Sequence, residues 1–218
     1  MNNNLLNQIN KEVFIIAELS ANHNGNIETA INTIKAAKRA GANAIKLQTY
    51  TADTMTIDSQ KEDFIIKKTI WQGQNLYKLY EKAYTPWDWH ETLFRTAKEE
   101  GLICFSTPFD KTAVDFLEEL ANPIYKIASF EITDIDLIKY VALKDKPIIM
   151  STGIAEEEDI SLALNSIREI NNKPLYLLKC TSSYPAPMEE ANLITLKDYE
   201  SKYNVIPGLS DHTKGIVA

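Results

Sequence analysis

Residues 175–185, LYLLKCTSSYP, join a continuously apolar run to a group of side chains that can do chemistry. Unbroken apolar character is typical of a strand in a parallel sheet that is covered on both faces. A lysine, a cysteine, hydroxyl residues and a tyrosine follow within the next few positions. A solvated loop needs no such convergence, but the active site of a barrel of parallel strands lies at the carboxyl ends of its strands. The stretch therefore predicts a strand end at a functional site.

The same pattern recurs along the chain. Polar residues end or interrupt further apolar runs: FIIAE (14–18), AIKLQT (44–49), ICFSTP (103–108), YKIASFE (125–131), IIMSTG (148–153) and VIPGLSDHT (205–213). Amphipathic segments separate most of them, because apolar residues recur at helical spacing between the runs. We expect helices over 27–40 (ended by Gly41), from a Thr85-Pro86 cap onward, after Asp110, and near 134–143, 156–170 and 191–203.

Alternating strands and helices predict an α/β fold with a parallel sheet. A closed (β/α)8 TIM barrel competes with an open doubly wound sheet, which concentrates its chemistry at one reversal of strand order. Nearly every strand end carries polar residues, and no Gly-x-Gly-x-x-Gly turn is present, so the barrel is favoured. Seven strands are predicted, the seventh interrupted by Pro207 and Gly208. We expect residues 1–218 to form one catalytic barrel domain, truncated after that strand as another helix begins at 215–218.

Composition excludes several classes of protein. The chain has 218 residues, is 44% hydrophobic and carries a net charge of −7, without a basic patch for nucleic acid. No apolar stretch approaches the roughly 20 residues that span a membrane. The first residues, MNNNLLNQINKE, lack the features of a signal peptide, so a cytoplasmic location is expected. Cys104 and Cys180 are predicted to be reduced, buried thiols, with a nucleophilic role for Cys180 as the alternative.

The connection over residues 49–86 is unusually long and rich in aromatic residues. A long connection on the catalytic face is usually a lid, a binding loop or a subunit contact. Short helices are expected near 61–69 and 75–83. The alternative, a solvated insertion, is weakened by the aromatic side chains.

Two lysines, Lys46 and Lys126, lie in otherwise apolar runs, where an ammonium group is costly to bury unless it is paired. Each could form a structural ion pair, and a lone lysine in a barrel could form a Schiff base with a carbonyl substrate. Together with nearby hydroxyl groups they favour a site for a phosphate or a carboxylate. The hydroxyl residues of this predicted anion site are Thr107, Ser129, Ser151 and Ser210.

Carboxylates and histidines supply further candidates. Glu18 and Glu131 end two of the runs and could act in acid–base catalysis, grip sugar hydroxyls or pair with the lysines. His212 follows a carboxylate that could orient it or support a metal, but by itself it cannot make a metal site, and the sequence shows no second strong ligand. His23 is interpreted as a hydrogen-bonded loop residue, and His90 as structural.

Seven of these motifs, in this order, resemble the sialic acid synthase family, and most closely its pseudaminic acid branch. They are AELSANHNG (17–25), AIKLQTY (44–50), FSTPFD (105–110), YKIASFEI (125–132), STGIA (151–155), LKCTSSYPAP (178–187) and GLSDHT (208–213). The resemblance runs from about residue 12 to the end of the chain, and the ordered set is highly specific.

The resemblance implies a TIM-barrel enzyme that condenses phosphoenolpyruvate with an open-chain N-acetylated amino sugar, releasing phosphate. For the pseudaminic branch the implied acceptor is 2,4-diacetamido-2,4,6-trideoxy-L-altrose, and the alternatives are the N-acetylneuraminate and legionaminate precursors. A divalent metal, Mn²⁺ or Mg²⁺, would polarise the aldehyde. The resemblance assigns phosphoenolpyruvate to Lys46, Thr107, Lys126, Ser129, Ser151, Ser182 and Ser210, the reacting carbons to Glu18, the sugar to Glu131 and Tyr184, and the metal to His212.

In the family, a second metal-binding histidine and a C-terminal antifreeze-like domain, which completes the site of a swapped homodimer, follow the matched region. We therefore expect residues 1–218 alone to have little synthase activity. Two other hypotheses stay open at this point. One is a lysine Schiff-base aldolase on the same fold, and the other is a non-catalytic domain that binds phosphoenolpyruvate.

Overall fold

The computed structural model describes residues 13–67 and 71–216. It divides into two compact units, Met1–Ser106 with Phe116–Asn122, and Thr107–Asp115 with Pro123–Ala218, and each is described by itself. The N-terminal segment and the last part of the expected helix at 215–218 lie outside the described residues. Among the described residues, none of the helices has the length and apolar character needed to cross a membrane.

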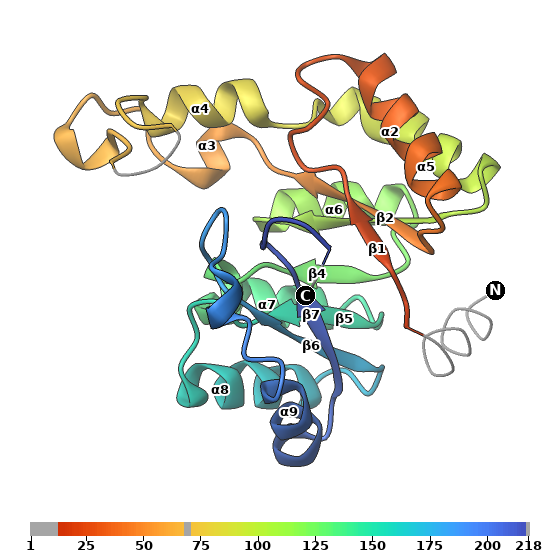
Figure 1. The fold of residues 1–218 in the computed structure, drawn as a ribbon, viewed down its shortest axis with the longest axis vertical. Coiled ribbons are helices and arrows are strands. Elements are labelled where there is room, and N and C mark those ends of the chain that lie inside the picture. The colour runs from red at the N-terminus through yellow and green to blue at the C-terminus, as the bar shows by residue number, and fades with distance from the viewer. Residues whose placement is uncertain (1–12, 68–70, 217–218) are drawn as a thin grey trace. The chain divides into compact units, whose positions relative to one another are not determined.

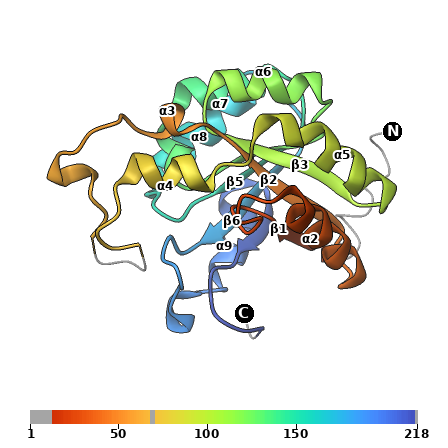
Figure 2. The ribbon, with the colours of Figure 1, turned by 90° about the horizontal axis from the view of Figure 1, so that it is seen from above.

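The first unit packs two helices beside its strands (Figures 1 and 2). Strand β1 pairs with β2 in parallel register, so that Glu18 lies opposite Lys46. Helices α2 and α5 pack against each other over a core that includes Ile34, Ile45 and Leu93. The bounds are β1 (Ile16–Glu18), α2 (Ile27–Arg39), β2 (Ala44–Thr49), α5 (His90–Glu99) and β3 (Ile103–Pro108), which ends in the second unit.

Helix α2 confirms the predicted helix over residues 27–40, and local chemistry explains both of its ends. The side chain of Asn26 accepts hydrogen bonds from the backbone amides of Glu28 and Thr29, which satisfies donors that the first turn leaves unpaired. Gly41 has a φ of +92°, a conformation that a residue with a Cβ rarely adopts. The helix therefore ends where the sequence places its glycine.

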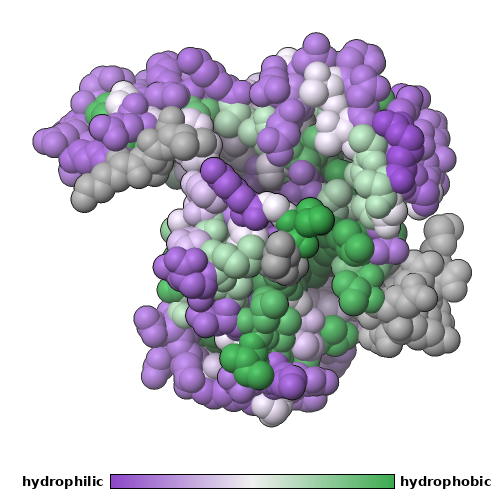
Figure 3. Space-filling view, in the orientation of Figure 1, coloured by the Kyte–Doolittle hydropathy of each residue, from purple (hydrophilic) through white to green (hydrophobic). Residues whose placement is uncertain are grey.

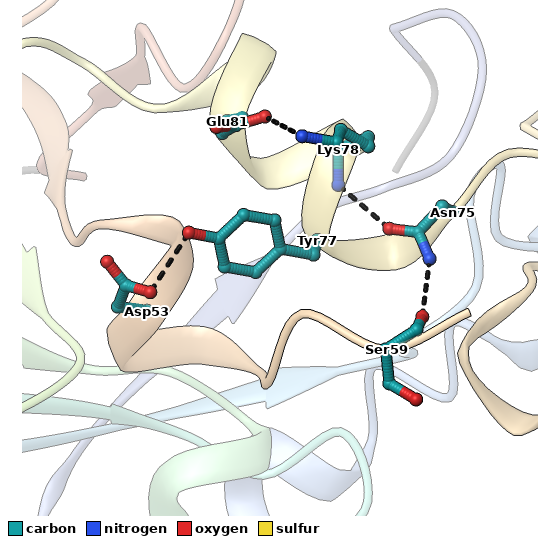
Figure 4. Close-up of polar contacts among 6 residues, drawn as sticks. All are labelled: Asp53, Ser59, Asn75, Tyr77, Lys78 and Glu81. Atoms are coloured by element: carbon teal, nitrogen blue, oxygen red, sulfur yellow. Dashed lines mark hydrogen bonds and ion pairs between the residues drawn. The ribbon is translucent and has the colours of Figure 1, made fainter. Parts of the chain in front are cut away.

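The long connection between β2 and α5 is ordered by its own hydrogen bonds (Figure 4). The Tyr77 hydroxyl donates to Asp53 at 2.9 Å, and the Asn75 side chain donates to the carbonyl of Ser59 at 2.7 Å while accepting from the Lys78 amide. These contacts argue against a solvated insertion. The connection comprises α3 (Ala52–Met55), η1 (Glu62–Phe64), α4 (Leu76–Ala83) and η2 (Trp87–Trp89). The helix expected near 75–83 is confirmed, whereas of that near 61–69 only η1 forms, and residues 68–70 lie outside the description.

The predicted Thr85-Pro86 helix start is wrong. Helix α5 begins at His90, after the short η2 turn, and Thr85 makes no cap. Thr85 is buried instead, with its hydroxyl 3.4 Å from Nε2 of His23. The Thr85 hydroxyl therefore makes a tertiary contact with His23 and does not form the helix cap that the local sequence had predicted.

A buried chain of hydrogen bonds explains several polar residues of the first unit. Nδ1 of His90 lies 3.2 Å from the Pro86 carbonyl, which can only accept, so Nδ1 carries the proton. Nε2 then accepts from the Thr49 hydroxyl at 2.9 Å, and Thr49 accepts from Ser106 at 2.7 Å. His90 is therefore structural, as predicted, and Ser106 has a structural partner.

Burial of His90 gives the fold a pH dependence with a defined sign. Burial is the largest influence on this histidine and lowers its pKa from 6.5 to about 4. A histidine with a depressed pKa in the folded state contributes stability that is complete above pH 6.5 and is lost as the pH falls toward 4. We expect this group to cost about 2 kcal/mol of unfolding free energy between pH 7 and pH 5.

The check is nitrogen-detected NMR of the His90 imidazole together with urea unfolding at both pH values. We expect Nδ1 to stay protonated and Nε2 to stay unprotonated at pH 5.5. A midpoint near pH 6.5 for this ring would contradict the assignment.

The second unit is a parallel sheet in the order β4-β5-β6-β7, with its helices in sequence between the strands. Helix α7 packs against α8, and α9 packs against β6 and β7 (Figure 1). Its bounds are β4 (Tyr125–Ile127), η3 (Phe130–Thr133), α7 (Ile135–Ala142), β5 (Ile148–Ser151), α8 (Glu157–Arg168), β6 (Leu175–Cys180), η4 (Met188–Glu190), α9 (Thr195–Tyr203) and β7 (Ile206–Ser210). Helix α6 (Lys111–Glu119) starts in this unit, capped by Asp110 as predicted.

Strand β7 forms despite its proline and glycine. Pro207 and Gly208 pair in register with Leu177 and Leu178 of β6. A Cβ on Gly208 would lie 2.5 Å from a methyl group of Leu178, so the glycine makes room for that leucine. Within the described residues β7 pairs on one side only, and Figure 3 shows apolar surface gathered around it in the lower half of the view.

Candidate active site

The ends of β4 and β5 hold a buried ammonium group. Lys126 is 4% exposed, and its Nζ donates to the Ser151 hydroxyl at 2.6 Å and to the carbonyl of Ile127 at 3.0 Å. Both of these acceptors are neutral, and the charge of Lys126 also acts on the carboxyl of Glu131. An ammonium group fixed next to a hydroxyl in this way is suited to binding an anion.

A second cluster surrounds the backbone of Gly153, just after β5. The Gly153 amide donates to the Ser129 hydroxyl at 3.1 Å. A Cβ at this glycine would collide with the hydroxyl of Ser182, lie 2.8 Å from that of Ser129 and lie 3.2 Å from Sγ of Cys180. Three strand ends therefore converge on a position where only hydrogen fits.

Cys180 is buried and free, as predicted, but it does not lie among apolar groups alone. Its Sγ is 3.8 Å from Nδ1 of His212. Burial, the largest single influence, raises the pKa of the thiol, but hydrogen bonds to His212, Ser129 and Ser210 together outweigh it and lower the pKa from 9.0 to about 7. The sequence showed no histidine near Cys180, because the two residues are brought together by the pairing of β6 with β7.

His212 is held by two neighbours at the end of β7. Nδ1 lies 3.0 Å from the carbonyl of Thr181, which can only accept, so Nδ1 carries the proton of this hydrogen bond. The ring of Tyr184 stacks on the imidazole, with centroids 4.1 Å apart and planes inclined by 30°. Both neighbours belong to the loop that follows β6.

Glu131 lies just after β4, and one oxygen of its carboxylate makes no hydrogen bond to a described residue. Its Oε2 is buried and has no hydrogen-bond partner among the described residues. Burial, the largest influence, raises the pKa of this carboxyl, although a backbone hydrogen bond and the charge of Lys126 oppose the shift. An unpaired buried carboxylate oxygen is costly, which marks Glu131 as a candidate for contact with a ligand.

In the first unit, Lys46 and Glu18 form an ion pair at 3.0 Å across β1 and β2. Lys46 is buried, whereas the Glu18 side chain is 46% exposed. The predicted pairing of strand-end lysine and carboxylate is therefore present here. Of the remaining predicted residues in the second unit, Thr107 is buried and Ser210 is half-buried beside Cys180.

Two features of this region were not predicted from the sequence. Gly153 gave no local signal, because its role depends on side chains from β4 and β6. Lys179 ends β6 much as Lys126 ends β4, yet it ties the following loop together by donating to Thr181 and to the carbonyl of Glu190. Strand-end position alone does not separate these two lysines.

No group of three or more histidine, cysteine, aspartate or glutamate residues that could hold a metal occurs among the described residues. His212 is the predicted residue that could take one ligand position, and its Nδ1 is fixed by a backbone carbonyl, as is usual for a metal-binding histidine.

Comparison with known proteins gives close relatives along nearly the whole chain. The chain is 51% identical to pseudaminic acid synthase of Campylobacter jejuni subsp. jejuni serotype O:2, over 95% of this chain and 61% of that protein. It is 48% identical to pseudaminic acid synthase of Helicobacter pylori, over 92% of this chain and 59% of that protein. The chain thus spans about three fifths of the length of these relatives.

A solved structure supports the fold. The crystal structure of N-acetylneuraminic acid (sialic acid) synthetase from Leptospira borgpetersenii matches with a TM-score of 0.84 and 32% identity, covering 95% of this chain and 67% of that one. The predicted α/β fold of the TIM-barrel type, with seven strands, is confirmed. Residues 33–218 match the NeuB family, and the chain belongs to that family.

Proposed function

We propose that the protein containing this chain is a pseudaminic acid synthase. It condenses phosphoenolpyruvate with 2,4-diacetamido-2,4,6-trideoxy-L-altrose to give pseudaminic acid and phosphate. The observation that carries the proposal is the buried ammonium of Lys126, fixed at 2.6 Å from the Ser151 hydroxyl. Membership of the NeuB family and identities near 50% to two pseudaminic acid synthases support the choice of substrates.

The second unit contains a lysine side chain and a set of hydroxyl donors that can bind phosphoenolpyruvate. Lys126 with Ser151 forms the charged part, and Ser129 with Ser182 lines the neighbouring cluster around Gly153. Hydroxyl groups can donate to phosphate or carboxylate oxygens without adding further charge. We assign Thr107 and Ser210 to the same set of hydroxyl donors. For the first unit by itself, we propose that Glu18 acts at the reacting carbons and that Lys46 binds phosphoenolpyruvate.

The reaction forms one carbon–carbon bond and breaks one carbon–oxygen bond. C3 of phosphoenolpyruvate attacks the aldehyde carbon of the open-chain sugar, and the aldehyde oxygen takes up a proton to become a hydroxyl. Water adds at C2, and the resulting tetrahedral intermediate expels phosphate as the C2–oxygen bond breaks and a ketone forms. Glu131, whose pKa is raised by burial, is suited to exchange a proton with the sugar or the water.

A divalent metal, Mn²⁺ or Mg²⁺, would act as a Lewis acid that polarises the aldehyde when it is bound. His212 is the residue of this chain that would hold the metal, and the Thr181 carbonyl fixes its ring through Nδ1. The remaining residues act without the metal: they bind the two anionic groups, orient them and hold protons.

A Schiff-base aldolase remains the competing mechanism for a buried lysine. Lys126 donates to two neutral acceptors, which an ammonium group and a neutral amine can both do, and a Schiff base needs the neutral amine. Borohydride treatment in the presence of pyruvate distinguishes the two. A trapped adduct on Lys126 would support the aldolase and exclude the proposed route.

Substitution of Gly153 by alanine tests the anion pocket. We expect the added methyl group to displace the hydroxyls of Ser182 and Ser129 and to weaken phosphoenolpyruvate binding about tenfold or more, measured by calorimetry. Gly208→Ala is the matched control, because its Cβ meets only the Leu178 side chain. It should lower thermal stability with little change in binding. Equal affinities for the Gly153→Ala variant and the parent would contradict this pocket.

The function itself is tested by acceptor-dependent phosphate release. The intact protein, with any residues that follow Ala218, is incubated with phosphoenolpyruvate, Mn²⁺ and each of three acceptors: the trideoxy-L-altrose, the legionaminate precursor and N-acetylmannosamine. We expect release with the first at a kcat/KM at least tenfold above the others. A preference for either of the other sugars would replace the proposed substrate, and release without any acceptor would contradict the reaction.

A further inference from the structure

Lys179, near the end of β6, holds the two ends of the loop that follows the strand. Its Nζ donates to the Thr181 hydroxyl at 2.6 Å, to the Glu190 carbonyl at 2.9 Å and to the Cys180 carbonyl at 3.3 Å. Contacts with three oxygens can use all the N–H groups of an ammonium, so among the described residues this side chain is committed to the loop. The Thr181 hydroxyl also donates to the Glu190 carbonyl, at 3.2 Å. The lysine therefore closes residues 180–190 into a loop.

The middle of this loop is exposed. Residues 183–185 lie at the surface, whereas Ala186 is buried and its amide donates to the carbonyl of His212 at 2.9 Å. Backbone with few buried side chains opens locally at low free-energy cost unless hydrogen bonds hold it. The position of the loop therefore depends on its attachments, at Lys179 and at Ala186.

Ser182 is the residue of this loop that reaches the cluster around Gly153. A Cβ on that glycine would collide with the Ser182 hydroxyl, and the Gly153 amide donates to the neighbouring Ser129 hydroxyl at 3.1 Å. Ser182 directly follows Thr181, whose hydroxyl is bound by Lys179. All of these residues belong to the second unit. Loss of the lysine would release the backbone one residue away from the Ser182 hydroxyl.

We propose that Lys179 is a positioning residue for Ser182, which closes the loop over residues 180–190 and thereby holds the Ser182 hydroxyl where it can donate to an anionic ligand. The inference rests on the proposed function only in naming phosphoenolpyruvate as that ligand. It gives two buried or half-buried lysines different tasks, since Lys126 is assigned to the anion itself and Lys179 acts through Ser182.

A double-mutant cycle on phosphoenolpyruvate affinity, measured by calorimetry on the intact protein, tests this coupling. Lys179→Met removes the donors and keeps an unbranched side chain, one atom shorter, and Ser182→Ala removes the hydroxyl. We expect each single variant to bind about tenfold more weakly, and Lys179→Met to add less than about twofold in the Ser182→Ala background. Equal effects of Lys179→Met in both backgrounds would mean that the lysine acts on the ligand directly or on the whole fold, and would overturn the inference.

Lys173→Met is the matched control. Lys173 lies just before β6, at the other end of the strand from Lys179, and pairs with Asp145 at 2.9 Å. The variant removes the same charge from the same unit without touching the loop, so phosphoenolpyruvate affinity should stay within about twofold of the parent. An equal loss of affinity in the two lysine variants would show that net charge is responsible and would contradict the inference.

Hydrogen exchange and steady-state kinetics give two further readouts. Peptides that cover residues 181–191 should exchange faster in Lys179→Met than in the parent, whereas peptides from β4 and β5 should keep their protection. The KM for phosphoenolpyruvate should rise about tenfold while kcat stays within about twofold, because the positioned hydroxyl contributes to binding. Faster exchange throughout the unit, or a lower kcat with an unchanged KM, would contradict the positioning role.

Failure of the proposed function would look different. A parent protein that binds phosphoenolpyruvate and shows the coupling between Lys179 and Ser182, but releases no phosphate with any acceptor, would refute the synthase and leave the role of Lys179 in place. An active synthase without that coupling would refute the role of Lys179 alone. A parent protein that binds neither phosphoenolpyruvate nor inorganic phosphate would overturn both.

Discussion

Replacing Lys126 with methionine is expected to weaken phosphoenolpyruvate binding by roughly 100-fold or more and to abolish measurable turnover. The substitution keeps an unbranched side chain, one atom shorter, in a buried place but removes the amino group that donates to Ser151. Removing one member of a buried, charge-assisted hydrogen-bonded pair typically costs about 2–5 kcal/mol, and every 1.4 kcal/mol is tenfold in affinity. Calorimetric titration with phosphoenolpyruvate measures the loss directly.

The matched control is Lys144→Met in the same unit. Lys144 pairs with Asp115 at 3.0 Å and lies over the ring of Tyr140, so the variant removes the same charge without touching the proposed pocket. Its affinity for phosphoenolpyruvate should stay within about threefold of the parent, because the charge of Lys144 is already paired with the exposed carboxylate of Asp115 and salt screens such exposed pairs. If both variants bound equally well, or if Lys126→Met kept the parent affinity, the anion site would be misassigned.

Replacing Glu131 with glutamine is expected to make the protein less active and more stable at the same time. The buried Oε2 has no partner among the described residues, and burial raises the carboxyl pKa above its usual 4.5. A folded-state pKa that is raised means that the folded state holds the proton more tightly. The stability of the native form is then greatest below pH 4.5 and is lost as the pH rises through the raised pKa. At pH 7 the glutamine variant carries a neutral amide, so it does not lose the folding stability that ionisation of the buried carboxyl costs the parent.

The catalytic cost should be large because the amide cannot exchange a proton. We expect kcat to fall about 100-fold, within the usual range for loss of a general acid or base, while the affinity for phosphoenolpyruvate changes little. Steady-state kinetics and thermal unfolding at pH 7 give the two readouts. Glu158→Gln, on the surface of α8, is the control and should change neither. A less stable Glu131→Gln variant would show that the carboxylate is structural.

The strands could be predicted from the sequence because burial on both faces leaves unbroken apolar runs. Even β7 formed where predicted, although Pro207 and Gly208 interrupt it, because they pair with Leu177 and Leu178. Helix starts were less predictable. Asp110 caps α6 as expected, but the Thr85 hydroxyl turned to His23, a partner 62 residues away that no local pattern reveals.

The candidate site likewise contains residues that the sequence identifies and residues that only contacts between strands reveal. The lysine of the YKIASFE motif was identified because an ammonium in an apolar run is costly, and the structure gives Lys126 a hydroxyl partner. Gly153 and the Cys180–His212 contact were not identified, since each depends on side chains from different strands. Lys179 shows the limit of the argument, because its strand-end position resembles that of Lys126 while its ammonium stabilises a loop.

The central claim is that this chain forms part of an enzyme that joins phosphoenolpyruvate to an aldehyde sugar with cleavage of the carbon–oxygen bond. The most direct test uses phosphoenolpyruvate labelled with ¹⁸O at the bridging oxygen between C2 and phosphorus. The intact protein is incubated with this substrate, the trideoxy-L-altrose acceptor and Mn²⁺, and both products are analysed by mass spectrometry. We predict that the label appears in the released phosphate and is absent from the nine-carbon keto acid. Label retained at C2 of the product, or phosphate release that does not require the sugar, would contradict the account.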